Sequence, residues 1–206
     1  MNRQEERSSQ TKAAILNAAE QEFSEKGIYG ARMDQIAKEA NCNKSLIYQY
    51  FGNKDSLYEL VLNRVYSRLG DFEMEVIREH GSWKKGLQKI VKTYFYFLKE
   101  NPSYVRMLMW ENLNYGRYFK EGELKQTKDP IRKELERILL LGKEAGEVKQ
   151  DISAVEVLQT LIACSFNYFS NTYTLGYVLR KDLMEDEQIE KRIKEVSRMI
   201  LCYLEN

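Results

Sequence analysis

The sequence contains few cysteines, which could cross-link the chain, and few prolines, which could interrupt its helices. Its 206 residues include two prolines, one histidine and three cysteines. Cys42, Cys164 and Cys202 form no CxxC pair, which argues against a disulfide framework and a structural zinc site and favours buried thiols. The single His80 cannot form a His-based metal cluster, and we expect it to cap a helix. The sequence thus predicts no metal and no cofactor.

Long apolar runs and a leader segment are also missing. Residues 1–12 are charged and polar, with no apolar run behind them. The longest apolar stretch, residues 158–169, includes Gln159 and is too short to span a bilayer. We therefore expect a cytoplasmic protein with no membrane partner, and its 43% hydrophobic content is enough for a core without staples.

Neither sign of charge dominates the sequence. The formal net charge is +1, whereas DNA-binding proteins usually carry a basic surplus. Cations and anions also balance within the first 55 residues. Any case for DNA binding must therefore depend on where the charges lie and not on their sum.

Apolar residues recur at three- and four-residue spacing almost throughout, which predicts an all-α protein of about nine helices. No segment alternates as a strand does. Gly27 is expected to stop the first helix, Asn53 and Ser82 to cap later ones, and Ser153 with Glu156 to form a capping box. The expected helices include 10–26, 33–40, 44–50, a long one after Asn53, one opened by Asp129 and Pro130, and 187–204.

Residues 30–57 carry the most informative motif, two short helices joined by a sharp turn. Such a turn needs a residue at positive φ, for which Asn41 is the usual second choice after glycine. Cys42 is expected to plug the space under the turn. Asn43 is placed to cap the next helix by accepting a hydrogen bond from the backbone N–H of Ser45 or Leu46.

The helix that follows this turn is expected to present a DNA-reading face. Ile47 and Phe51 would hold its inner side against the core. Taken singly, each outer residue is better explained as a solvated side chain, but the set at this spacing favours major-groove and phosphate contacts. The outer face combines a cation, a hydroxyl, an apolar tip, a phenol and an amide, from Lys44, Ser45, Leu46, Tyr48 and Gln49.

The segments ILNAAEQEFSEKG and IAKEANCNKSLIYQYFGNKDSL, within residues 10–60, resemble the DNA-binding domain of the TetR family of regulators. The matching positions are Ile47, Tyr48, Tyr50, Phe51 and Lys54, while Asn41, Arg32, Ser45 and Leu46 depart from the common pattern. The resemblance implies that Tyr48 and Lys54 contact phosphate. The expected DNA-binding residues are Arg32, Asn43, Lys44, Ser45, Leu46, Tyr48, Gln49 and Lys54.

The larger C-terminal half is rich in aromatic residues with polar ones among them, which suits both a helical core and an apolar pocket. The expected pocket residues are Tyr94, Trp110, Glu111, Asn112, Phe166, Asn167 and Phe169. The helix before the last has two apolar stripes, of which one can face its own domain and the other a partner. The resemblance implies a homodimer through the last two helices, and the residues expected there are Val157, Leu161, Cys164, Tyr168, Ile193, Val196, Ile200 and Tyr203.

These observations predict a helix-turn-helix domain over residues 1–53, a linking helix over 54–80, and a ligand-binding and dimerisation domain over 81–206. The expected function is a ligand-responsive regulator, a repressor released from a palindromic operator on double-stranded DNA by a small, largely apolar effector. A helical protein-binding adaptor is the alternative. An enzyme with an unrecognised site is a weaker one, because no catalytic constellation is present.

Overall fold

The computed structural model describes residues 3–76, 81–119 and 130–205. The described residues form ten named helices and no β-strand, which agrees with the all-α prediction and roughly with its count. They fall into two compact units, one of residues 1–68 with 103–126 and one of residues 69–102 with 127–206. The expected domains, 1–53, 54–80 and 81–206, are instead continuous in sequence. Their division by function stays a prediction. Asp129, expected to open a helix with Pro130, and His80, expected to cap a helix, lie outside the described residues.

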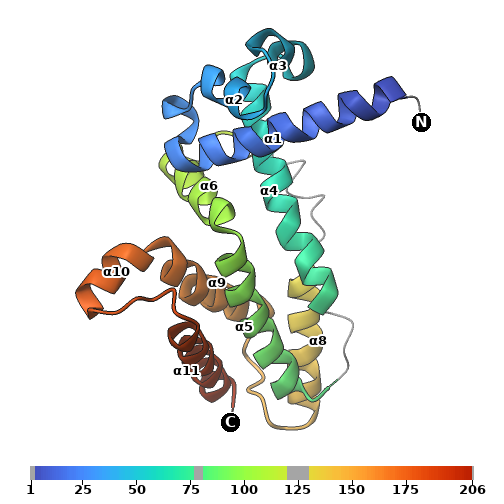
Figure 1. Ribbon diagram of the computed structural model, residues 1–206. Coiled ribbons are helices and arrows are strands. Elements are labelled where there is room, and N and C mark those ends of the chain that lie inside the picture. Colours follow the sequence, from blue (N-terminus) through green and yellow to red (C-terminus); the bar gives the residue numbers. More distant parts are fainter. Residues whose placement is uncertain (1–2, 77–80, 120–129, 206) are drawn as a thin grey trace. The chain divides into compact units, whose positions relative to one another are not determined.

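The first unit contains α1 (Arg3–Gly30), α2 (Met33–Glu39), α3 (Lys44–Phe51), the beginning of α4 (Lys54–Val76) and α6 (Pro102–Leu113). Figure 1 shows α2 and α3 gathered beside α1 and the start of α4. The core of this unit includes Ile15, Ala19, Phe23, Ile36 and Ile47, none of which exposes any surface. Ile15, Ala19 and Phe23 lie four residues apart on α1 and form its buried face.

Gly27 marks the end of the regular part of α1, as its sequence position predicts. Its φ of 63° and ψ of 175° interrupt the helix, which resumes as one further turn to Gly30. A Cβ atom at this position would lie 2.7 Å from the ring of Trp110 on α6. Glycine is therefore required twice at this site, once by the positive φ and once by the close approach of an indole.

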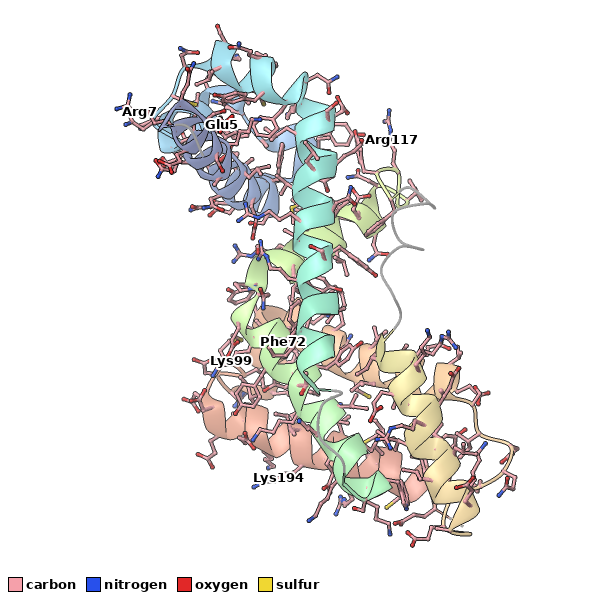
Figure 2. The ribbon with its side chains drawn as sticks, turned by 90° about the vertical axis from the view of Figure 1, so that its right-hand side faces the viewer. Glu5, Arg7, Phe72, Lys99, Arg117 and Lys194 are labelled. Atoms are coloured by element: carbon pink, nitrogen blue, oxygen red, sulfur yellow. The ribbon has the colours of Figure 1, made fainter. Side chains whose placement is uncertain are left out.

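The second unit contains the end of α4, α5 (Trp83–Glu100), α8 (Pro130–Glu144), α9 (Ala154–Ser170), α10 (Thr172–Leu179) and α11 (Asp186–Leu204). Helix α5 is its centre, since it packs against α8, α9 and α11. Figure 2 labels Phe72 on α4, whose ring centroid lies 5.3 Å from that of Phe97 on α5. No helix in the described ranges is long and apolar enough to cross a membrane.

Local capping signals confirm the predicted beginnings of α5 and α9, whereas α1 begins at Arg3 and not at residue 10 as expected. Ser82 accepts from the backbone N–H of Lys85, and Ser153 and Glu156 form the reciprocal capping box at the start of α9. Helix α10 was not expected. Its sequence, TYTLGYVL, carries β-branched residues and an internal glycine, all of which lower intrinsic helix propensity.

Candidate DNA-binding surface

The turn between α2 and α3 has the geometry that its sequence predicts. Asn41 adopts a φ of 51°, and the backbone N–H of Cys42 reaches back to the carbonyl of Ala37 at 3.0 Å. The Oδ1 atom of Asn43 accepts from the backbone N–H of Leu46 at 2.8 Å. An N-cap of this kind stabilises a helix by about 1 kcal/mol. The turn and the cap together fix the direction in which α3 leaves α2.

Helix α3 buries one face and exposes the other. Ile47 is fully buried, and Phe51 is half-buried. On the outer face Tyr48 is 41% exposed, and Leu46 is half-buried. The remaining predicted contact residues on this helix and its cap, Asn43, Lys44, Ser45 and Gln49, are all exposed. The residues predicted to contact DNA from α3 and its cap are therefore accessible, Leu46 only in part.

The residue pair Asn53 and Lys54 opens helix α4 next to α3. The Oδ1 atom of Asn53 accepts from the backbone N–H of Ser56 at 2.8 Å, which confirms the predicted cap. Lys54 therefore stands in the first turn, where the helix dipole favours an anion. A phosphate at this point would meet the helix N-terminus and an ammonium group together.

Lys44 is already paired in the structure. Its Nζ atom lies 3.0 Å from Oδ1 of Asp34 on α2, and both side chains are largely exposed. The hydrogen bond to Asp34 raises the pKa of Lys44 above its ordinary value. An exposed pair of this kind contributes little stability, so its main effect is to hold the lysine across the turn.

Glu22 on α1 supports the start of α2 in a way that the sequence did not reveal. Arg32 lies before α2 without a side-chain cap, and its own side chain is exposed. Its backbone N–H donates to Oε1 of Glu22 at 3.0 Å, while Lys26 contacts Oε2 at 2.8 Å. Burial alone would raise the pKa of Glu22, but these two hydrogen bonds outweigh it and the pKa lies below its ordinary value.

The residues predicted to form the dimer interface are mostly inside the protomer. Val157, Leu161, Ile193, Val196 and Ile200 each expose 5% of their surface or less. They leave almost no area for a partner, so the stripe expected at the interface packs within its own unit. Of the others, Tyr168 is also buried, Cys164 is half-buried and Tyr203 is exposed. The other apolar stripe of α9, which includes Val155 and Ile162, is the accessible one. Val155 is 57% exposed and Ile162 is 44% exposed.

The predicted pocket residues divide between the two units. Tyr94, Phe166, Asn167 and Phe169 belong to the second unit, where Tyr94 and Phe169 are buried in its core. Trp110, Glu111 and Asn112 belong to the first unit. A cavity of about 350 Å³ does lie between α9, α10 and α11, and Asn167 is the one predicted pocket residue in its wall.

Comparison with known proteins gives this arrangement a family. The model of bacterial regulatory proteins of the tetR family matches residues 15–61, and the tetracyclin repressor-like C-terminal domain matches residues 84–200. The chain belongs to the TetR family. It is accordingly a DNA-binding, helix-turn-helix transcriptional regulator, in agreement with the resemblance of its N-terminal motif.

Curated relatives and solved structures agree with this assignment. The HTH-type transcriptional repressor NicS of Pseudomonas putida is 28% identical over 178 residues, which are 86% of this chain and 84% of that protein. The repressor SCO4008 of Streptomyces coelicolor is 33% identical over 153 residues, which are 74% of this chain and 75% of that protein. The structure of FadR from Bacillus subtilis in complex with stearoyl-CoA has the same fold, with a TM-score of 0.65 at 17% identity over 92% of this chain and 97% of that one.

Helix α6 of this TetR-family protein is fastened to the DNA-binding helices by a buried polar network. The carboxylate of Glu111, 1% exposed, accepts from the phenol of Tyr58 at 2.9 Å and from the backbone N–H of Tyr118 at 3.1 Å. The phenol of Tyr118 in turn donates to Asp55 at 2.7 Å. Burial and the bond to Asp55 raise the pKa of Tyr118 to about 12. Both phenols therefore stay protonated donors at neutral pH.

A second set of contacts joins α6 to α1. The indole Nε1 of Trp110 donates to the carbonyl of Ser24 at 3.2 Å, and Ser103 donates to Glu20 at 2.6 Å. Trp110 and Glu111 thus tie α6 into the first unit, a role different from the pocket contacts expected of them. Asn112 is exposed and donates to the carbonyl of Leu108 on its own helix.

Replacing Glu111 should therefore destabilise the protein rather than merely alter a pocket. In Glu111→Ala the buried Tyr58 phenol and the Tyr118 N–H lose their acceptor, which we expect to lower the free energy of unfolding by about 2–4 kcal/mol. Urea denaturation measures this loss. Asn112→Ala is the matched control on the same helix and should cost no more than about 0.5 kcal/mol. Equal stability of the two variants would contradict a structural role for Glu111.

Proposed function

We propose that this TetR-family regulator is a repressor that binds a palindromic operator as a homodimer and leaves it when a small effector binds. The observation that supports this most is the exposed face of α3, which carries Lys44, Ser45, Tyr48 and Gln49 on a helix whose cap and core contacts fix its direction. In the proposal, Lys44, Ser45, Leu46 and Gln49 face the bases. Tyr48 and Lys54 grip the phosphates that flank them.

Variants of α3 and α4 should separate base reading from phosphate binding. Gln49→Ala should relax the preference at one or two operator positions, at a cost of about 1–3 kcal/mol for the preferred base. Tyr48→Phe and Lys54→Ala should weaken specific and nonspecific duplexes alike. Binding to a set of single-base operator variants measures both effects. A changed sequence preference in Lys54→Ala, or an unchanged one in Gln49→Ala, would contradict the assignment.

The accessible faces of α9 and α11 are the proposed dimer interface. Ile162 and Val155 on α9 are exposed, and so are Met199 (55%) and Tyr203 (53%) on α11. The two helices pack together, so these side chains lie on neighbouring helices of one unit. Apolar side chains exposed on two helices that pack together suit a two-fold helical bundle.

Charge placed on this face should therefore break the dimer. In the double variant Ile162→Glu with Met199→Glu, carboxylates would be desolvated without partners, so we expect monomers and loss of operator binding. Light scattering after size exclusion measures the mass. Leu113→Glu, at an exposed apolar residue of the first unit, is the control and should leave the dimer intact. A double variant that remained a dimer with full operator affinity would place the interface elsewhere.

The cavity between α9, α10 and α11 is the proposed effector site. Its wall combines the apolar side chains of Leu175, Leu179 and Leu183 with the cations Lys181, Lys191 and Arg192. Glu195 is the acidic group in the wall, and its carboxylate lies 3.7 Å from the Arg192 guanidinium. About 350 Å³ is within the usual range for small-molecule sites. An apolar molecule with an anionic head fits this composition.

Decanoate and decanol test this effector class, because they share an apolar chain and differ in charge. Decanoate should bind more tightly, weaken operator binding, and lose affinity about tenfold or more in Arg192→Gln. Calorimetry with wild type and variant measures the first and last effects. Since binding free energies are reciprocal, saturating operator should weaken decanoate binding by the same factor. Equal affinity for decanol and decanoate would contradict an anion-binding cavity.

A further inference from the structure

The first three turns of α1 form a helix that packs into no core. From Gln4 to Ala14 every side chain is exposed or half-buried, and Ile15 is the first buried residue of the chain's described part. We call residues 4–14 the α1 arm. A helical segment this short gains little from its own hydrogen bonds. Because no side chain of the arm is buried, packing against a core does not explain why this segment is helical.

The α1 arm instead contacts the recognition helix. The hydroxyl of Ser8 donates to the phenol oxygen of Tyr50 on α3 at 3.2 Å. One turn later, the Nζ atom of Lys12 lies 5.0 Å from the centroid of the Tyr50 ring. Both contacts lie within the first compact unit. They hold the arm against Tyr50 of α3, the helix proposed to enter the major groove.

Arg7 stands next to Ser8 on this arm and is exposed. Figure 2 labels Arg7 and shows its side chain pointing outward from the helices of the first unit. The acidic residues Glu5 and Glu6 precede it in the first turn, where the helix dipole stabilises them. Arg7 and Lys12 are the exposed cations of the arm that lie C-terminal to these two carboxylates.

The dimensions of DNA make this position a phosphate-binding one. The major groove is about 12 Å wide and is filled by one helix, so an element beside that helix lies over a bordering backbone. Arginine and lysine there form charge-assisted bonds with phosphate oxygens. We propose that Arg7 and Lys12 of the α1 arm form a second DNA contact, binding phosphates next to the groove that α3 occupies. This inference rests on the proposed function.

The salt dependence of DNA binding tests the arm directly. Wild type, Arg7→Gln, Lys12→Gln and the double variant would be titrated with a random-sequence duplex and with the operator between 50 and 200 mM salt. Each lost contact should reduce the slope of log K against log salt by about 0.9, because one fewer counterion is released. Affinity should fall by the same factor on both duplexes. Thermal unfolding should change little, because Arg7 and Lys12 are exposed and an exposed cation–π contact is worth about 0.5–1 kcal/mol.

Lys194→Gln is the matched control, because it removes one exposed cation from α11 in the second unit. It should leave the slope at the wild-type value. Arm variants with the same slope as this control would overturn the inference, and so would variants that change sequence preference at constant slope. A wild-type protein without salt-dependent duplex binding would instead overturn the proposed function, so the two failures are distinguishable.

Discussion

Helix α3 has only eight residues, and a helix of this length does not hold its own position in water. Its direction depends on the constraint imposed by the α2–α3 turn. Asn41 takes the positive φ that the turn requires, and Asn43 closes the first turn of α3. The fully buried side chain of Ile47 then packs α3 against the core. A recognition helix can read bases only if its side chains are held in one orientation. The α2–α3 turn therefore determines how the exposed face of α3 meets the DNA.

The unit that supports α3 includes a piece of chain from far along the sequence. Residues 103–126 cluster with the N-terminal helices, although residues 69–102 lie between the two segments in sequence and belong to the other unit. Within this piece, Glu111 satisfies Tyr58, and Tyr118 binds Asp55 directly beside Lys54. A movement of α6 would therefore act on the first turn of α4. The DNA-binding unit therefore contains a buried polar network that ties α6 to the beginning of α4.

Local signals made much of this predictable from the sequence. The positive φ at Asn41, the caps at Asn43 and Asn53, and the break at Gly27 each depend on a few neighbouring residues. Burial of α9 was not predictable in the same way. Its two apolar stripes have similar composition, and only packing against α5 and α11 decides that Val157 and Leu161 face inward.

Contacts between distant parts of the chain were also out of reach. Tyr58 and Glu111 are 53 residues apart, and no motif near either residue predicts that they form a hydrogen bond. From the sequence alone, a glutamate that binds a ligand cannot be distinguished from one that accepts a hydrogen bond from a buried tyrosine. Glu22 is similar, because its i,i+4 pairing with Lys26 is visible in the sequence but its bond to the backbone of Arg32 is not.

Selection of bound duplexes from a random-sequence pool tests the central claim most directly, because it assumes no operator. If two copies of α3 read DNA as a two-fold dimer, the selected sequences should converge on an inverted repeat. The centres of its half-sites should lie about 10 base pairs apart, or a multiple of that spacing, as two recognition helices on one face of the duplex require. Recovery of a single unrepeated site, or of no consensus at all, would contradict the account.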